Sequence, residues 1–268
     1  MYHSDAIQKR YKGFCATKVL WHHSFKGLNQ LHVMHSSNTS FSRALLQKRR
    51  LGQLAEQFAF HQLEQLENCR ILAENVQIQK GKQTIGELDA LIELNRKPIH
   101  LEGVYKFYVY DKTKGTSEIE HWIGPNRKDS LIEKITKLKN KQLPLLHSSE
   151  CMATLKELNL NRNSIQQEVL FKAQLFIPYQ KTVNFNELNQ DCVCGFYINK
   201  SQLNDFNTCK FYIPEKLDWF LKVNDCVDWL NFETFKSQAD VFLQASQSPL
   251  IWIKKHDESF IKCFLVWW

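Results

Sequence analysis

The feature that most constrains the fold is a change of hydrophobic period near residue 70. From Leu51 to Leu66, apolar residues recur at helical spacing with Gln and Glu between them. Three short segments rich in Val, Ile, Leu and Tyr follow at 71–79, 84–94 and 98–110, separated by turn residues. This order predicts a helix followed by a three-stranded antiparallel meander.

Further elements are expected on both sides of this meander. Apolar residues between 129 and 143 repeat with a helical period, and Pro144 is expected to end that helix. The segment 168–177 predicts another strand, and the rest of the chain predicts two strands, a helix and a terminal hairpin. The first forty or so residues predict a peripheral helix and loop, and the polar stretch 36–43 a linker or helix start.

These elements predict an α/β protein with a mixed sheet and a smaller α+β C-terminal part. The expected parts are an N-terminal helical and loop extension at 1–41, a core at 42–185 and a C-terminal α+β part at 186–268.

Composition is typical of an ordinary globular protein and excludes the disordered and fibrous classes. Of 268 residues, 43% are hydrophobic and 24% are charged, which is enough apolar material for a core. No apolar run approaches the roughly 18 residues of a membrane span, and the first residues lack the apolar core of a secretory signal. We therefore expect a cytoplasmic protein with no membrane partner and reduced cysteines.

Acidic side chains concentrate on two neighbouring strands of the predicted meander. Side chains two residues apart on a strand share a face, so Glu102 and Lys106 lie together on one strand, and Asp89 lies on the strand before it. If these strands are antiparallel neighbours, Asp89 and Glu102 can converge. Two carboxylates are suitable ligands for Mg²⁺ or Mn²⁺, which would polarise a phosphoryl oxygen and activate a bound water.

Two further residues complete the predicted phosphodiester-cleaving site. Glu56, on the helix before the meander, is placed to tune a second ion or to anchor a metal-bound water. Lys106 would stabilise the developing negative charge or orient that water. His100 shares the face of Glu102, where it could assist proton transfer or simply fill the end of the strand.

Positive charge follows the acidic strands and indicates a polyanionic partner. The net charge is +7, and Lys134, Lys137 and Lys141 form a stripe that suits either a solvated helix flank or phosphate contacts. In the WIGPN segment and after it, Asn126 and Arg127 either belong to a turn or contact phosphate. If these five residues contact phosphate, they predict a nucleic acid partner, with DNA favoured over RNA.

The blocks that carry these residues resemble a known superfamily. The order of the motifs is similar to the PD-(D/E)XK, or restriction-endonuclease-like, pattern. These motifs are an acidic residue on a helix, a GExD strand, a Glu and a Lys on a third strand, and a basic helix. The blocks LGQLAEQ, GELDALIE, HLEGVYKFYVY, WIGPN and QLPL also resemble a bacterial domain-of-unknown-function family assigned to that superfamily. The resemblance implies an αβββαβ core with catalytic positions at Glu56, Asp89, Glu102 and Lys106, and with a metal held by Asp89 and Glu102.

One spacing departs from the superfamily pattern. The acid and the Lys are usually two residues apart, roughly 7 Å along a strand, whereas Glu102 and Lys106 are four apart, about 13 Å. Val104 occupies the usual Lys position, and a bulge at Gly103 or a migrated Lys would restore the geometry. We therefore expect either a metal-dependent nuclease or a catalytically inactive nuclease-fold protein that acts as a binding or scaffold module.

Overall fold

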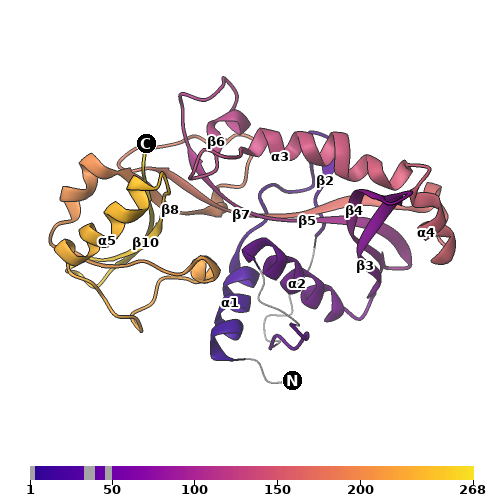
Figure 1. The fold of residues 1–268 in the computed structure, drawn as a ribbon, viewed down its shortest axis with the longest axis horizontal. Helices are drawn as coiled ribbons and strands as arrows, with labels where there is room; N and C mark the ends of the chain where they lie inside the picture. The colour runs from indigo at the N-terminus through magenta and orange to yellow at the C-terminus, as the bar shows by residue number, and fades with distance from the viewer. Residues whose placement is uncertain (1–3, 33–39, 46–49) are drawn as a thin grey trace. The chain divides into compact units, whose positions relative to one another are not determined.

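The computed structural model describes residues 4–32, 40–45 and 50–268 (Figure 1). The first half of the polar stretch predicted as a linker or helix start, residues 36–39, lies outside these residues. The chain forms two compact units, and each draws on three separate segments. Unit 1 combines Met1–Gln8, Val19–Tyr105 and Glu133–Lys172; unit 2 combines Lys9–Lys18, Lys106–Ile132 and Ala173–Trp268.

Unit 1 contains the predicted helix and meander. Its strands are ordered β3-β4-β5-β7, and the pairs β3–β4 and β4–β5 are antiparallel. Its elements are β1 (Ser24–Phe25), β2 (Leu28–Asn29), α2 (Leu51–Glu64), β3 (Cys69–Lys80), β4 (Gln83–Leu94), β5 (Lys97–Tyr110), α3 (Leu131–Lys137), α4 (Cys151–Glu157) and β7 (Gln166–Pro178). The predicted helix at 51–66, the meander and the strand at 168–177 are confirmed.

Helices cover the strands of unit 1 from both sides, with α2 and α3 on opposite faces in Figure 1. Leu54 and Phe58 are four residues apart, so they lie on one face of α2, and both are buried. Leu88 and Leu91 on β4 pack in a cluster with Leu146. Both sides of the central strands are therefore apolar, unlike a sheet with one solvated face.

Pro144 does not end the helix that begins at α3, so that expectation was wrong. The chain continues as a π-helical turn at Leu138–Gln142 and a 3₁₀ helix at Leu143–His147. Pro144 lies at the start of the 3₁₀ helix, where its missing N–H removes no intrahelical hydrogen bond.

Unit 2 is built on strands in the order β7-β8-β11-β10-β9. The pairs β7–β8 and β8–β11 are parallel, whereas β11–β10 and β10–β9 are antiparallel, so this sheet is mixed. Its elements are β6 (Trp122–Ile123), β8 (Val193–Asn199), β9 (Lys210–Tyr212), η7 (Lys216–Phe220), α5 (Phe232–Gln244), β10 (Leu250–Lys254) and β11 (Phe260–Val266), together with α1 (Asp5–Ala16) from Lys9 onward. Strand β6 pairs with β5.

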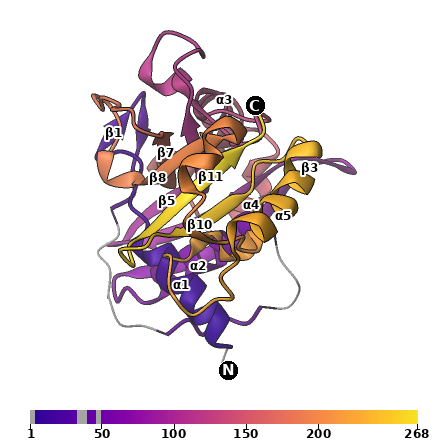
Figure 2. The same cartoon turned by 90° about the vertical axis from the view of Figure 1, so that its left-hand side faces the viewer.

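The core of unit 2 lies where α5 packs beside β10, as Figure 2 shows. Phe235 of α5 stacks on Phe211 of β9 at a ring-centroid distance of 4.1 Å. The predicted terminal hairpin and helix are confirmed. The N-terminal helix differs from expectation, because α1 buries Tyr11 and Phe14 instead of lying at the periphery. Among the described residues, no helix is both long enough and apolar enough to cross a bilayer.

Candidate active site

The antiparallel register of β4 and β5 places Asp89 beside Glu102. The backbone pairs run from Leu94 with Lys97 to Ala90 with Leu101 without a shift, and they stop there. At the next position the Oδ2 atom of Asp89 accepts a hydrogen bond from the Gly103 N–H at 2.9 Å. The Asp89 side chain therefore takes the place of a backbone ladder bond, which fixes its carboxylate against β5.

The charge on Asp89 depends on its burial and on charged groups within unit 1. Burial, followed by the negative charge of Glu102, raises the pKa of Asp89 to about 8. The Gly103 hydrogen bond opposes this shift, Glu56 on α2 adds to it, and Lys134 opposes it. The fold thus brings three of the four predicted catalytic residues into one electrostatic cluster, together with Lys134.

Glu102 is fully buried and accepts a hydrogen bond on each of its carboxylate oxygens. Its Oε1 atom lies 3.0 Å from the Nε2 atom of His100, which is also fully buried. Its Oε2 atom accepts a hydrogen bond from the side-chain amide of Gln142, at the end of the π-helical turn. The Oε1 atom of Gln142 in turn accepts from the Nζ atom of Lys134 at 2.7 Å. Glu102 is therefore held from two sides.

The protonation of His100 follows from its partners. The Nε2 atom of Gln167 donates to the carbonyl oxygen of Leu143 at 2.6 Å, which fixes the orientation of the Gln167 amide because a carbonyl only accepts. The same amide nitrogen lies 3.1 Å from Nδ1 of His100. Nδ1 is then the acceptor, so the ring proton is on Nε2 and is donated to Glu102.

Lys106 has a different environment from the one predicted. Its Nζ atom donates to the Oδ2 atom of Asp129 at 2.6 Å, and both residues belong to unit 2, whereas the carboxylate cluster belongs to unit 1. Lys134 is the lysine whose charge acts on Asp89. A catalytic role of Lys106 stays a prediction.

The donor set of the cluster suits a hard cation. Asp89 and Glu102 offer carboxylate oxygens, and a bound cation would offset both the burial and the repulsion by Glu102 that raise the pKa of Asp89. Within the described ranges, however, no three or more His, Cys, Asp and Glu side chains are grouped closely enough to hold a metal ion. A metal ion here would have two carboxylates as protein ligands and water or substrate oxygens at its other positions, and metal binding by Asp89 and Glu102 stays a prediction.

The segment at 122–127 forms a turn, as one of the two interpretations predicted. The Arg127 N–H donates to the Gly124 carbonyl oxygen at 2.8 Å, and Asn126 Oδ1 accepts from the Ser248 N–H at 2.7 Å. The guanidinium of Arg127 donates to Asp111 at 2.8 Å and stacks on the ring of Trp268. Asn126 and Arg127 thus hold unit 2 together, and phosphate contacts by them stay a prediction.

The lysine stripe predicted on the helix divides into two groups. Lys134 is half-buried and bonded to Gln142, whereas Lys137 and Lys141 are exposed. Only these last two have the exposure expected of groups that contact a polyanion.

Sequence reasoning placed His100 on the face of Glu102 but missed Gln167. His100 is two residues before Glu102, a spacing that places both on one face of a strand. Gln167 is 67 residues from His100, and no local pattern links them.

A family model described as a domain of unknown function (DUF1853) matches residues 8–262. This chain belongs to the DUF1853 family. No curated protein matches the chain, and no solved structure matches it. The DUF1853 match includes every residue of the carboxylate cluster and its hydrogen-bonding partners.

Proposed function

We propose that this DUF1853 protein has a restriction-endonuclease-like, PD-(D/E)XK core, binds nucleic acid and hydrolyses phosphodiester bonds with Mg²⁺ or Mn²⁺. The observation that carries the proposal is the electrostatic cluster of Glu56, Asp89 and Glu102, in which the pKa of Asp89 is raised to about 8. Strongly perturbed carboxyl groups with identified charged neighbours are common at catalytic sites.

The order of elements supports the proposed core. From α2 onward, unit 1 runs through α2, β3, β4, β5, α3, α4 and β7, which is the αβββαβ order expected from the resemblance with one additional short helix, α4, before the last strand. The helix contributes Glu56, the second and third strands contribute Asp89 and Glu102, and the following helix contributes Lys134. Each acidic residue therefore comes from the element on which the resemblance implies it.

Each residue of the cluster has its own role in the proposed reaction. When bound, the metal ion polarises the phosphoryl oxygen and lowers the pKa of a coordinated water. Asp89 and Glu102 hold the ion, while His100 and Gln142 keep the Glu102 carboxylate in one orientation. The ammonium of Lys134 lies in the same cluster and supplies positive charge as negative charge develops on phosphate.

A second candidate is a nuclease-fold protein that binds nucleic acid without cutting it. The observation that favours it is the geometry of Glu102, whose two oxygens already accept hydrogen bonds from His100 and Gln142. In this case Glu102 has a structural role, and the exposed Lys137 and Lys141 would still contact phosphates through charge.

Cleavage assays separate the two candidates. Plasmid, linear duplex and single-stranded DNA, and an RNA of matched length, are incubated with the protein in Mg²⁺ or Mn²⁺. We expect metal-dependent cleavage that falls by at least about a hundredfold in Asp89→Asn and Glu102→Gln. Glu87→Gln, an exposed acid on the same strand, is the matched control and should cleave like the wild type. Equal cleavage by all four folded proteins would refute the nuclease, and binding without cleavage would favour the second candidate.

A further inference from the structure

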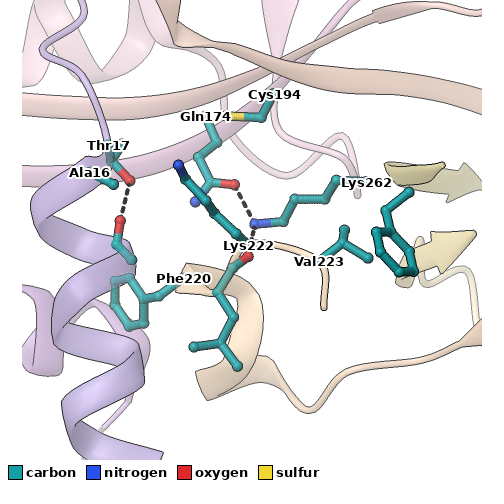
Figure 3. A pocket seen from close by; sticks show the side chains of 11 residues that line it. Ala16, Thr17, Gln174, Cys194, Phe220, Lys222, Val223 and Lys262 are labelled. Carbon is teal, nitrogen blue, oxygen red and sulfur yellow. Dashed lines mark hydrogen bonds between the residues drawn. The ribbon is translucent and has the colours of Figure 1, made fainter. Parts of the chain in front are cut away.

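Unit 2 contains a groove that the carboxylate cluster does not use. Two adjoining cavities, of about 310 Å³ and about 420 Å³, share Gly13, Ala16, Leu221 and Lys222 in their walls. Volumes in this range are typical of sites for small organic ligands. One wall is α1 and the other is the segment that follows η7 (Figure 3).

The wall formed by α1 results from one face of that helix. Lys9, Lys12, Gly13 and Ala16 are spaced i, i+3, i+4 and i+7, so they line the groove together. Gly13 permits the two walls to meet, because a Cβ atom at this position would lie 2.2 Å from the Phe220 carbonyl oxygen. The groove is thus a consequence of α1 packing closely on the end of η7.

Lys262 fixes the opposite wall. Its buried Nζ atom donates to the Oε1 atom of Gln174 at 2.6 Å (Figure 3). It also donates to the carbonyl oxygens of Trp219 at 2.6 Å and Leu221 at 2.9 Å. An ammonium group has three hydrogens, so these bonds use all of them. Burial lowers the pKa of Lys262 to about 8, which leaves it charged at pH 7. Lys262 therefore contributes positive potential to the groove rather than a hydrogen bond to a ligand.

The charge of the groove has one sign. Lys9, Lys12, Lys222 and Lys262 line the two cavities, and no described residue in either lining is an Asp or a Glu. Two nearby acids are paired elsewhere in unit 2: Asp218 with Arg10 at 2.7 Å, and Asp225 with Lys254 at 2.9 Å. The walls of the groove therefore offer no carboxylate to Lys12 and Lys222.

The rest of the lining is largely apolar. Phe220, Leu221, Val223 and Phe260 contribute to the first cavity, beside the cationic residues. A planar ring can pack on such a surface while an attached phosphate lies at the lysines, an arrangement that combines stacking with charge. A nucleotide carries both groups.

We propose that this groove of unit 2 binds a nucleotide, with the phosphate at Lys12 and Lys222 and the base against the apolar wall. The proposal rests on unit 2 alone and is independent of the hydrolysis proposed for unit 1. Free mononucleotides and the nucleotides of a single strand share this chemistry, so the test includes both.

Calorimetric titrations with AMP, adenosine, inorganic phosphate and oligo(dA) test the proposal. We expect AMP or oligo(dA) to bind, adenosine and phosphate to bind at least about tenfold more weakly, and affinity to fall with added salt. The double variant Lys12→Gln/Lys222→Gln should bind at least about tenfold more weakly with a smaller salt slope. Lys255→Gln, an exposed lysine outside both cavities, is the matched control.

A steric variant keeps the test decisive if the charge variant affects folding. Ala16 is exposed on α1 and lines both cavities, so Ala16→Trp fills the groove without changing its charge and should abolish binding. Binding of AMP shows that free nucleotides suffice, and binding of oligo(dA) alone assigns the groove to a strand. The proposal is overturned if neither binds, if adenosine binds as tightly as AMP, or if oligo(dA) binding depends on Lys137 and Lys141 but not on Ala16.

Discussion

At the residue scale, Asp89 is an acidic group whose protonation depends on the fold. Its pKa rises from an ordinary 3.8 to about 8, first because it is buried and second because Glu102 is near. At pH values between 3.8 and about 8, Asp89 is ionised in the unfolded chain but keeps its proton in the folded chain. The folded state therefore binds more protons, and the stability of the protein should fall as pH rises through this window.

Asp89→Asn tests this dependence, because Asn is uncharged and still offers an oxygen to the Gly103 N–H. We expect the variant to match the wild type near pH 4 and to be more stable by roughly 1–3 kcal/mol at pH 8. Urea unfolding at a series of pH values measures the difference. Glu87→Gln, on the exposed part of β4, is the control. Parallel curves for wild type and Asp89→Asn would show that Asp89 is not perturbed.

His100 gives a second prediction, which does not require catalysis. The Gln167 amide faces Nδ1, so we expect the neutral ring of His100 to carry its proton on Nε2. In Gln167→Leu this constraint is lost, and a mixture of tautomers should appear. The ¹⁵N shifts of the imidazole rings distinguish these states.

His121 is an internal control in the same spectrum. Its Nδ1 atom lies 2.6 Å from the carbonyl oxygen of Lys114, which can only accept, so this ring should carry a proton on Nδ1. A wild-type spectrum in which His100 also carries its proton on Nδ1 would contradict the hydrogen-bond chain to Glu102.

The two lysines of the predicted site should differ in their effect on catalysis. Lys134 acts on Asp89 and bonds to Gln142, so Lys134→Ala should lower kcat by about a hundredfold or more. Lys106 is paired with Asp129, so Lys106→Ala should cost less than about tenfold. Cleavage rates in Mn²⁺ measure both variants, with Lys134→Arg as the charge-conserving control. A larger loss of kcat in Lys106→Ala than in Lys134→Ala would instead support the catalytic role that the sequence predicts for Lys106.

At the element scale, the π-helical turn after α3 is the feature that completes the site. Hydrogen bonding from i to i+5 differs from the α-helical register, and such turns are frequent at functional sites. Here the turn ends at Gln142, whose amide donates to Glu102 while accepting from Lys134 one element earlier. The helical period of the sequence predicts a helix in this region but carries no signal for the change of register.

The parallel pairing of β8 and β11 depends on Gly195. A Cβ atom at this position would lie 1.8 Å from the carbonyl oxygen of Lys262, so Gly195→Ala should push the strands apart and destabilise the protein by roughly 3 kcal/mol. A Cβ atom added at Gly52, on α2, would meet no heavy atom within 4 Å.

Gly52→Ala should instead stabilise the protein by roughly 0.5–1 kcal/mol, because Ala loses less backbone freedom in a helix. Thermal and urea unfolding of both variants check the opposite signs. Destabilisation of similar size in both would mean that close approach at Gly195 is not the cause.

At the scale of the whole molecule, the chain is divided in a way that its linear pattern does not suggest. The sequence predicts three consecutive parts, and those boundaries stay a prediction. The two compact units instead each combine three segments, so α1 belongs to unit 2 from Lys9 onward although the residues before and after that segment belong to unit 1. Apolar periodicity is a property of a few neighbouring residues, and it says little about which distant segments share a core.

The sequence by itself determined the helix that begins at Leu51, the three strands of the meander and the placement of acids on two of them. Such features depend on local periodicity and turn chemistry, which the residues carry wherever they lie. Only the tertiary structure decided that Lys134 reaches the carboxylates, that Gln167 orients His100 and that four lysines meet in one groove. The partners of long side chains are set by the packing of distant segments, and local pattern carries no record of that packing.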